Sequence, residues 1–149
     1  MTKILQMILS GLLFGFVVDF FFFLGLFLNY IKPKGIDVYF NIFFVDNQNI
    51  FIYLALSVFI GYLIMFSKNI IKVPIILVIF LVGSSTLLPD VAKKVAEVMF
   101  EKKDVTLHNK KFTFRGDIYY IGREKITFFD KDLNKIILLD KGEIIDETY

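Results

Sequence analysis

The feature that most constrains this chain is an apolar run over residues 4–28 with one carboxylate, Asp19, inside it. At about 1.5 Å of rise per residue, a helix of about 25 residues exceeds the roughly 30 Å hydrocarbon core of a bilayer. The run is longer than the apolar core of a secretory signal peptide, and no small-residue cleavage site closes it. It therefore predicts a retained transmembrane helix.

Small residues share one face of this predicted helix with the acid. Gly11, Gly15 and Asp19 recur at intervals of four residues, which places them in one stripe. Transmembrane helices associate through close backbone approach at such stripes and through hydrogen bonds from polar side chains. We expect this face to contact protein. Asp19 is then either a neutral, hydrogen-bonded packing residue or a partner-binding or proton-linked group.

The composition places the whole chain in the membrane class. Hydrophobic residues make up 56% of it and the mean hydropathy is +0.67, whereas soluble domains are about 45–50% apolar. The net charge of +2 comes from mixed acids and bases, which excludes the dominant basic stripe of a nucleic-acid surface. The absence of cysteine excludes disulfides and thiolate metal sites. Abundant Phe, Ile and Lys without Trp suggest an AT-rich bacterial genome.

Two further spans are predicted over residues 50–66 and 73–88, the second with Pro74 in its first turn. They should be antiparallel neighbours. In the first of them, Tyr53, Ser57 and Gly61 again lie four residues apart. We expect this second stripe to pack on the Asp19 face, with a hydrogen bond from Tyr53 or Ser57 to the carboxylate.

The segment over residues 36–45 is too short to cross a bilayer and too apolar for a free loop. Its aromatic residues suit the boundary between membrane and water. We interpret it as interfacial or re-entrant. It serves either as a docking surface for a partner or as a lid on the chain's own helices.

The expected organisation is a transmembrane region over residues 1–89, an amphipathic linker helix over 90–103 and a small antiparallel β-module over 104–149. The linker shows helical spacing of its valines, and the module shows period-two alternation broken by turn residues. We expect Gly116 to be one of these turns, which gives six short strands. The predicted fold class is membrane α+β: three transmembrane helices, the short linker helix and the β-module.

Lysines near the ends of the predicted spans indicate the orientation. Three of them share one side, and six share the side of the β-module: Lys3, Lys68 and Lys72 against Lys32, Lys34, Lys93, Lys94, Lys102 and Lys103. Because positive charges favour the cytoplasmic side, we expect a multi-pass protein of the bacterial inner membrane with a cytoplasmic β-module.

Motifs for chemistry are weak. His108 is the one histidine and has no Cys or second His to form a metal site with. Asp130, Asp132 and Asn134 resemble the start of a calcium loop, but Lys135 and Lys141 replace the glycine and the glutamate that such a loop needs. The hydroxyl residues at 84–86 have no base beside them for catalysis, although they can bond to the preceding turn or across to another helix. We therefore expect no catalytic residue, cofactor or metal.

The leading hypothesis is a non-enzymatic accessory or assembly protein that packs on a larger membrane complex such as a flagellar stator, a respiratory complex or a secretion machine. Its candidate packing or partner residues are Gly11, Gly15, Asp19, Tyr53, Ser57 and Gly61. The alternative is a homo-oligomeric channel or transporter with Asp19 lining the pathway, and an enzyme comes third. The partners expected are a larger membrane protein complex or the chain itself, and the lipid bilayer.

Overall fold

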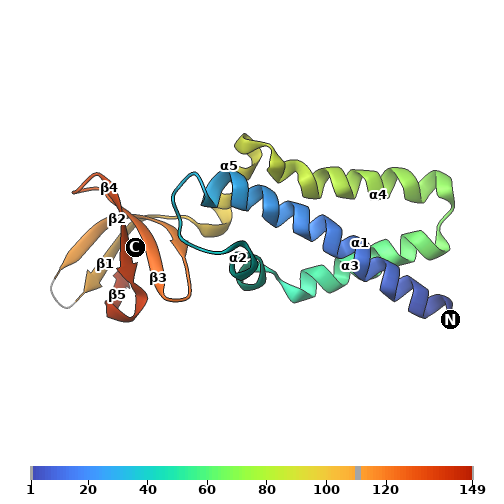
Figure 1. Cartoon of the computed structure of the whole chain (residues 1–149), viewed down its shortest axis with the longest axis horizontal. Helices are drawn as coiled ribbons and strands as arrows, with labels where there is room; N and C mark the ends of the chain where they lie inside the picture. Colours follow the sequence, from blue (N-terminus) through green and yellow to red (C-terminus); the bar gives the residue numbers. More distant parts are fainter. Residues whose placement is uncertain (1, 110–111, 149) are drawn as a thin grey trace.

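The computed structural model describes residues 2–109 and 112–148, and positions 110, 111 and 149 of the predicted module lie outside this description. A group of long helices occupies one end of the molecule and a small β-sheet the other (Figure 1). The coarse prediction of helices followed by an antiparallel module is confirmed. The chain is therefore an α+β protein.

Five α-helices and two short turns of other helix types make up the first hundred residues. They are α1 (Lys3–Leu26), the π-helical turn η1 (Phe27–Ile31), α2 (Phe40–Asn47), α3 (Ile50–Phe66), α4 (Asn69–Ser84), the 3-10 turn η2 (Ser85–Leu87) and α5 (Pro89–Phe100). Two continuous helical stretches, Lys3–Ile31 and Asn69–Leu87, are long and apolar enough to cross a membrane. α2 and α3, bent by 84° against each other, are long and apolar enough only when they are counted together as one broken span.

Local chemistry explains where these helices begin. Asn49 precedes α3 and its side chain accepts hydrogen bonds from the backbone N–H groups of Phe51 and Ile52, which are otherwise unpaired in a first turn. Pro89 opens α5, where its missing N–H costs nothing. α4 begins at Asn69, four residues before the expected start of the span, so Pro74 lies inside the helix and not in its first turn.

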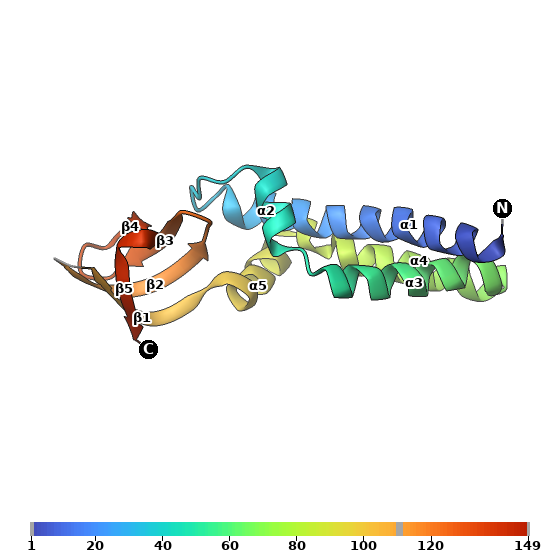
Figure 2. The same ribbon diagram turned by 90° about the horizontal axis from the view of Figure 1, so that it is seen from below.

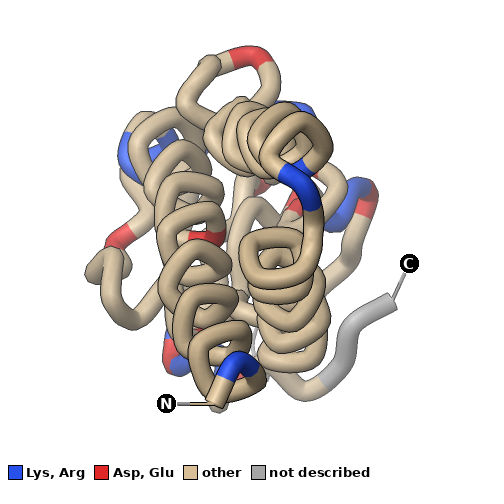
Figure 3. The backbone as a smooth tube through the Cα atoms, turned by 90° about the vertical axis from the view of Figure 1, so that its right-hand side faces the viewer, with Lys and Arg blue, Asp and Glu red and all other residues tan. Residues whose placement is uncertain are grey.

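α1 is the helix on which the others pack (Figure 2). α3 lies along it and α4 contacts it, whereas α3 and α4 touch each other little although a short turn joins them. The expectation that α3 and α4 are antiparallel neighbours is therefore only partly right, because α1 and not α4 is the main neighbour of α3. Figure 3 looks onto the end of the helices, where blue segments mark the start of α1 and the turn into α4, and most of the helical tube is uncharged.

The sheet has five antiparallel strands in the order β4-β3-β2-β1-β5 and curls around its own core. The strands are β1 (Lys102–Asn109), β2 (Thr113–Ile121), β3 (Lys125–Asp130), β4 (Lys135–Asp140) and β5 (Ile144–Thr148), with a 3-10 turn η3 (Lys141–Glu143) between the last two. Inside the curl lie Val105, Leu107, Ile118, Ile126 and Phe128. β4 and β5 are the edges.

The predicted turn at Gly116 is wrong, because β2 runs through it and replaces two of the six expected strands. A Cβ atom at this position would lie 1.8 Å from the carbonyl oxygen of Phe129 on β3. Gly116 is therefore present because two backbones approach closely.

A second apolar core joins the helices to the sheet. It unites side chains from the end of α1, from η1, from α2, from α5 and from β2, and its largest fully buried members are Tyr30 and Phe43. Aromatic rings contact one another throughout, as in the pair of Phe43 and Tyr120 with centroids 6.0 Å apart. The sheet is consequently packed against the helices and is not a loosely tethered domain.

Candidate functional site

The structure brings four of the six predicted site residues into one contact between α1 and α3. A Cβ at Gly11 would lie 2.0 Å from the carbonyl oxygen of Ser57, and one at Gly61 would lie 2.2 Å from that of Met7. A Cβ at Gly15 would meet the Ser57 hydroxyl at 2.4 Å. The two stripes therefore pack on each other within the chain, with their backbones in close contact.

The two remaining site residues, Tyr53 and Asp19, do not form the expected hydrogen bond with each other, and neither does Ser57 with Asp19. Tyr53 donates its hydroxyl to the carbonyl oxygen of Leu12 at 3.0 Å, and the Ser57 hydroxyl is buried without a hydrogen-bond partner among the described residues. Asp19 accepts a hydrogen bond from Gln48 Nε2 at 2.5 Å instead. The prediction that Tyr53 or Ser57 satisfies Asp19 is therefore wrong.

Gln48 gives Asp19 a defined place in the bundle. It lies just before α3, at the bend between α2 and α3. From Lys3 to Asp19, α1 rises by about 24 Å, and the 17 residues of α3 rise by about 25 Å, at about 1.5 Å per residue. Asp19 consequently lies level with the beginning of α3 and not midway along it.

Hydroxyl and amide groups also connect α1 to the segment that follows α4. Thr86 donates to the carbonyl oxygen of Phe22 at 2.8 Å, and Asn29 donates to the carbonyl oxygens of Thr86 and Leu87. Ser84 bonds back to Phe80 in the preceding turn. The prediction that these hydroxyl residues bond to the preceding turn or across to another helix is confirmed in both forms. The sequence did not indicate the hydrogen bonds of Asn29.

A buried charged cluster lies where the helices meet the sheet. Glu101 is the single residue between α5 and β1, and its side chain is only 6% exposed. Its Oε1 accepts hydrogen bonds from Lys34 Nζ at 2.6 Å and from the Tyr30 hydroxyl at 2.9 Å. Lys34 Nζ also lies 3.2 Å from the centroid of the Tyr119 ring. Burial, aided by the charge of Glu101, raises the pKa of Tyr119.

A second contact ties the β2–β3 hairpin to the end of α2. Arg123 donates two hydrogen bonds to Asp46, at 2.8 and 2.6 Å, and this pairing raises the pKa of Arg123. Asn47 donates to the Tyr120 hydroxyl at 3.2 Å. Together with the Glu101 cluster, this ion pair fixes the sheet against the loop and helix that follow α1.

The residues weighed for metal chemistry have structural partners. His108 Nδ1 lies 3.1 Å from the Thr113 hydroxyl on the neighbouring strand. Asp130 accepts hydrogen bonds from the backbone N–H groups of Asp132 and Leu133, as in an ordinary turn. Within the described residues, no group of three His, Cys, Asp or Glu side chains converges on a metal-sized space.

Comparison of the chain with family models, with curated proteins and with solved structures gives no match. Sequence reasoning found the glycine stripes through their spacing, but it missed Gln48, Lys34 and Glu101. A lone polar residue in a loop or at a helix end carries no periodic signal, because its partner lies far along the chain.

Proposed function

We propose that this chain is a small, non-enzymatic accessory or assembly protein that crosses the bacterial inner membrane three times and docks on a larger membrane complex. The crossings are α1 with η1, α3 as the membrane-crossing part of the bent α2–α3 pair, and α4 with η2, while α2 lies in the membrane surface. The 17 residues of α3 are at the lower limit of the length that spans a bilayer. The β-module then faces the cytoplasm, on the side with the larger number of flanking lysines.

The observation that carries this proposal is the combination of a fixed module with an apolar edge strand. Among the strands that the structure describes, β4 pairs only with β3, and its residues Ile136 and Leu138 are 45% and 50% exposed. Unpaired strand edges with apolar side chains are surfaces on which a partner adds a strand. Because the Glu101 cluster and the Arg123–Asp46 pair hold the module, this edge is presented at a constant position relative to the membrane.

The contacts of the helical region support partner docking by the β-module and not by the helices. The glycine stripes that favour helix association are already filled by the chain's own backbone, as at Gly61, where a Cβ would lie 2.2 Å from the carbonyl oxygen of Met7. Gly25, outside the stripes, is filled in the same way by the main chain of Thr86 at 2.3 Å. The outward faces are large apolar side chains, for example Leu77 and Val78 of α4, which lipid covers well. We therefore assign membrane anchoring to the helices and partner docking to the module.

Replacing Ile136 by Lys is expected to lower recovery of the partner complex at least about ten-fold, because a charge would enter the buried centre of the interface. The measurement is affinity purification of the full chain in mild detergent, with stoichiometric partners identified by mass spectrometry. Leu133→Lys is the matched control, since Leu133 is 56% exposed in the adjacent turn and lies outside the edge strand. Recovery of a homo-oligomer alone, with ion flux in liposomes, would contradict the proposal.

Asp19 separates this proposal from the channel alternative. Because its carboxylate accepts a hydrogen bond from Gln48, Asp19→Asn should retain the contact and leave complex recovery within about two-fold of the parent. Asp19→Leu leaves the Gln48 amide unpaired. This unsatisfied amide should lower the free energy of unfolding by about 1–3 kcal/mol and reduce complex recovery accordingly. A proton-linked or ion-conducting role predicts instead that Asn already abolishes activity. Complex recovery and liposome flux, measured for both variants, decide between them.

A further inference from the structure

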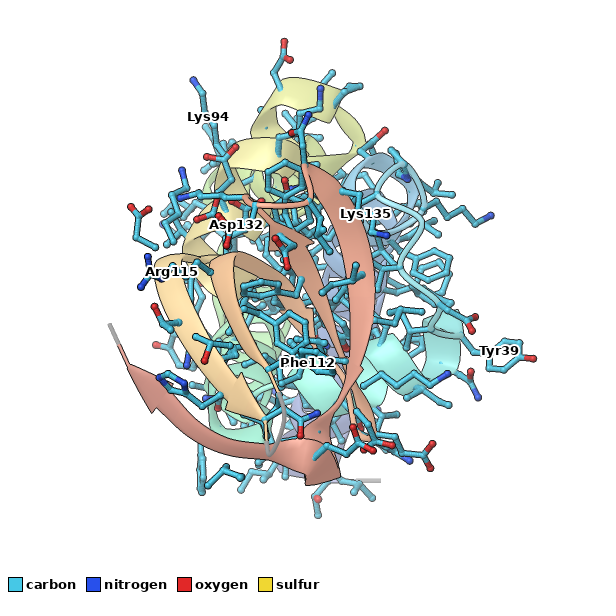
Figure 4. All side chains as sticks on the ribbon, turned by 90° about the vertical axis from the view of Figure 1, so that its left-hand side faces the viewer. Tyr39, Lys94, Phe112, Arg115, Asp132 and Lys135 are labelled. Carbon is cyan, nitrogen blue, oxygen red and sulfur yellow. The ribbon has the colours of Figure 1, made fainter. Side chains whose placement is uncertain are left out.

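A groove of about 380 Å³ opens between α2 with its preceding loop and the β2–β3 hairpin. Its apolar lining includes Ile36, Val38 and Ile42 on one side and Leu138 of β4 on the other. The exposed Tyr39 also lines it. In Figure 4, Tyr39 extends away from the strands beside α2. The volume falls within the range of small-molecule sites, which is about 300–1,000 Å³.

The groove lies at the height of lipid headgroups if the helices cross the membrane as proposed above, and the inference rests on that placement. With Lys3 at the far boundary, Asp19 is about 24 Å along α1, within about 6 Å of the near boundary of a 30 Å hydrocarbon core. Gln48 contacts Asp19 directly, and α2 precedes it at 84° to α3. α2 and the groove beside it consequently lie in the headgroup layer.

The charges of the groove match a headgroup that carries both signs. Arg123 and Asp46 neutralise each other. The lining then offers two carboxylates, Asp37 and Glu124, and one ammonium, Lys125. Lys125 lies across from Asp140 of β4 and forms no ion pair among the described residues. A phosphate suits the ammonium, and a primary ammonium suits the carboxylates because it has three N–H donors.

We propose that this groove binds the headgroup of an aminophospholipid. The phosphate binds Lys125, the primary ammonium binds Asp37 and Glu124, and the first acyl carbons lie on the apolar lining. Phosphatidylcholine has no N–H donor for the carboxylates, and phosphatidylglycerol offers them no cation. The site therefore selects phosphatidylethanolamine from the lipids that surround the protein.

The test uses the full chain reconstituted in vesicles of equal parts phosphatidylethanolamine, phosphatidylglycerol and phosphatidylcholine. The protein is then extracted in mild detergent, and retained lipid is counted by native mass spectrometry. Phosphatidylethanolamine should be retained at least about five-fold over each other lipid, as expected for charge-assisted hydrogen bonds. Lys125→Gln and Asp37→Asn should each remove this preference. Lys135→Gln and Asp132→Asn are matched controls that should leave it unchanged, since both side chains are exposed outside the groove.

Equal retention of the three lipids, or the same loss in the control variants, would overturn the headgroup inference. A peptide that crosslinks to position 39 and is recovered in the groove in place of lipid would also overturn this inference. Carbonate extraction of membranes separates this inference from the proposed function. A chain that carbonate releases overturns both, whereas an embedded chain without lipid preference overturns the headgroup site alone.

Discussion

Gly61→Leu is expected to separate α1 from α3 and to lower the free energy of unfolding by more than about 3 kcal/mol. Overpacking costs about 1–3 kcal/mol where neighbouring side chains rearrange. Here the Cβ alone would lie 2.2 Å from the Met7 carbonyl oxygen and 3.2 Å from the Gly11 Cα. Both atoms belong to the main chain of α1, so relief requires movement of the whole helix.

Thermal unfolding of the detergent-solubilised chain measures this effect. Ala55→Leu provides the matched control, because Ala55 is exposed on the same helix and the added side chain meets only lipid or detergent. Gly61→Ala should fall between the parent and Gly61→Leu. An unchanged unfolding temperature for Gly61→Leu would show that α1 and α3 do not pack through their glycines.

The α1–α3 contact shows what the sequence alone predicts well. Small residues at intervals of four on each helix, such as Gly11 with Gly15 and Ser57 with Gly61, define a packing face through their spacing alone. The partner of Asp19 was not predictable in the same way. Gln48 lies 29 residues further along the chain, in a loop whose path depends on the bend between α2 and α3.

The sheet shows the complementary case. Period-two alternation located most strands, because alternate side chains of a strand are buried and the sequence carries that pattern directly. Gly116 was misread, since glycine is common both in turns and at positions where a neighbouring backbone leaves no space for a Cβ. Only the position of Phe129 on β3 separates these two cases.

The ion pair between Lys34 and Glu101, which connects helices and sheet, is the part that sequence reasoning missed, and it gives the second large effect. Lys34→Met is expected to lower the free energy of unfolding by about 3 kcal/mol, because loss of one partner leaves the other charge buried and uncompensated. Glu101 is 6% exposed and would retain one donor, the Tyr30 hydroxyl. The substituted Met preserves the approximate length of the side chain and its contact with the Tyr119 ring.

Chemical denaturation of the full chain in detergent measures the loss, and Glu101→Gln combined with Lys34→Met tests its cause. Gln is neutral and still accepts from Tyr30, so the double variant should recover more than half of the stability lost by Lys34→Met alone. Arg123→Ala, which breaks the more exposed ion pair with Asp46, should cost far less. If the double variant is no more stable than Lys34→Met, buried charge is not what Lys34 compensates. The Lys34 side chain then stabilises the junction through its packing on Tyr119, and the orientation of the β-module depends on aromatic contacts in place of electrostatics.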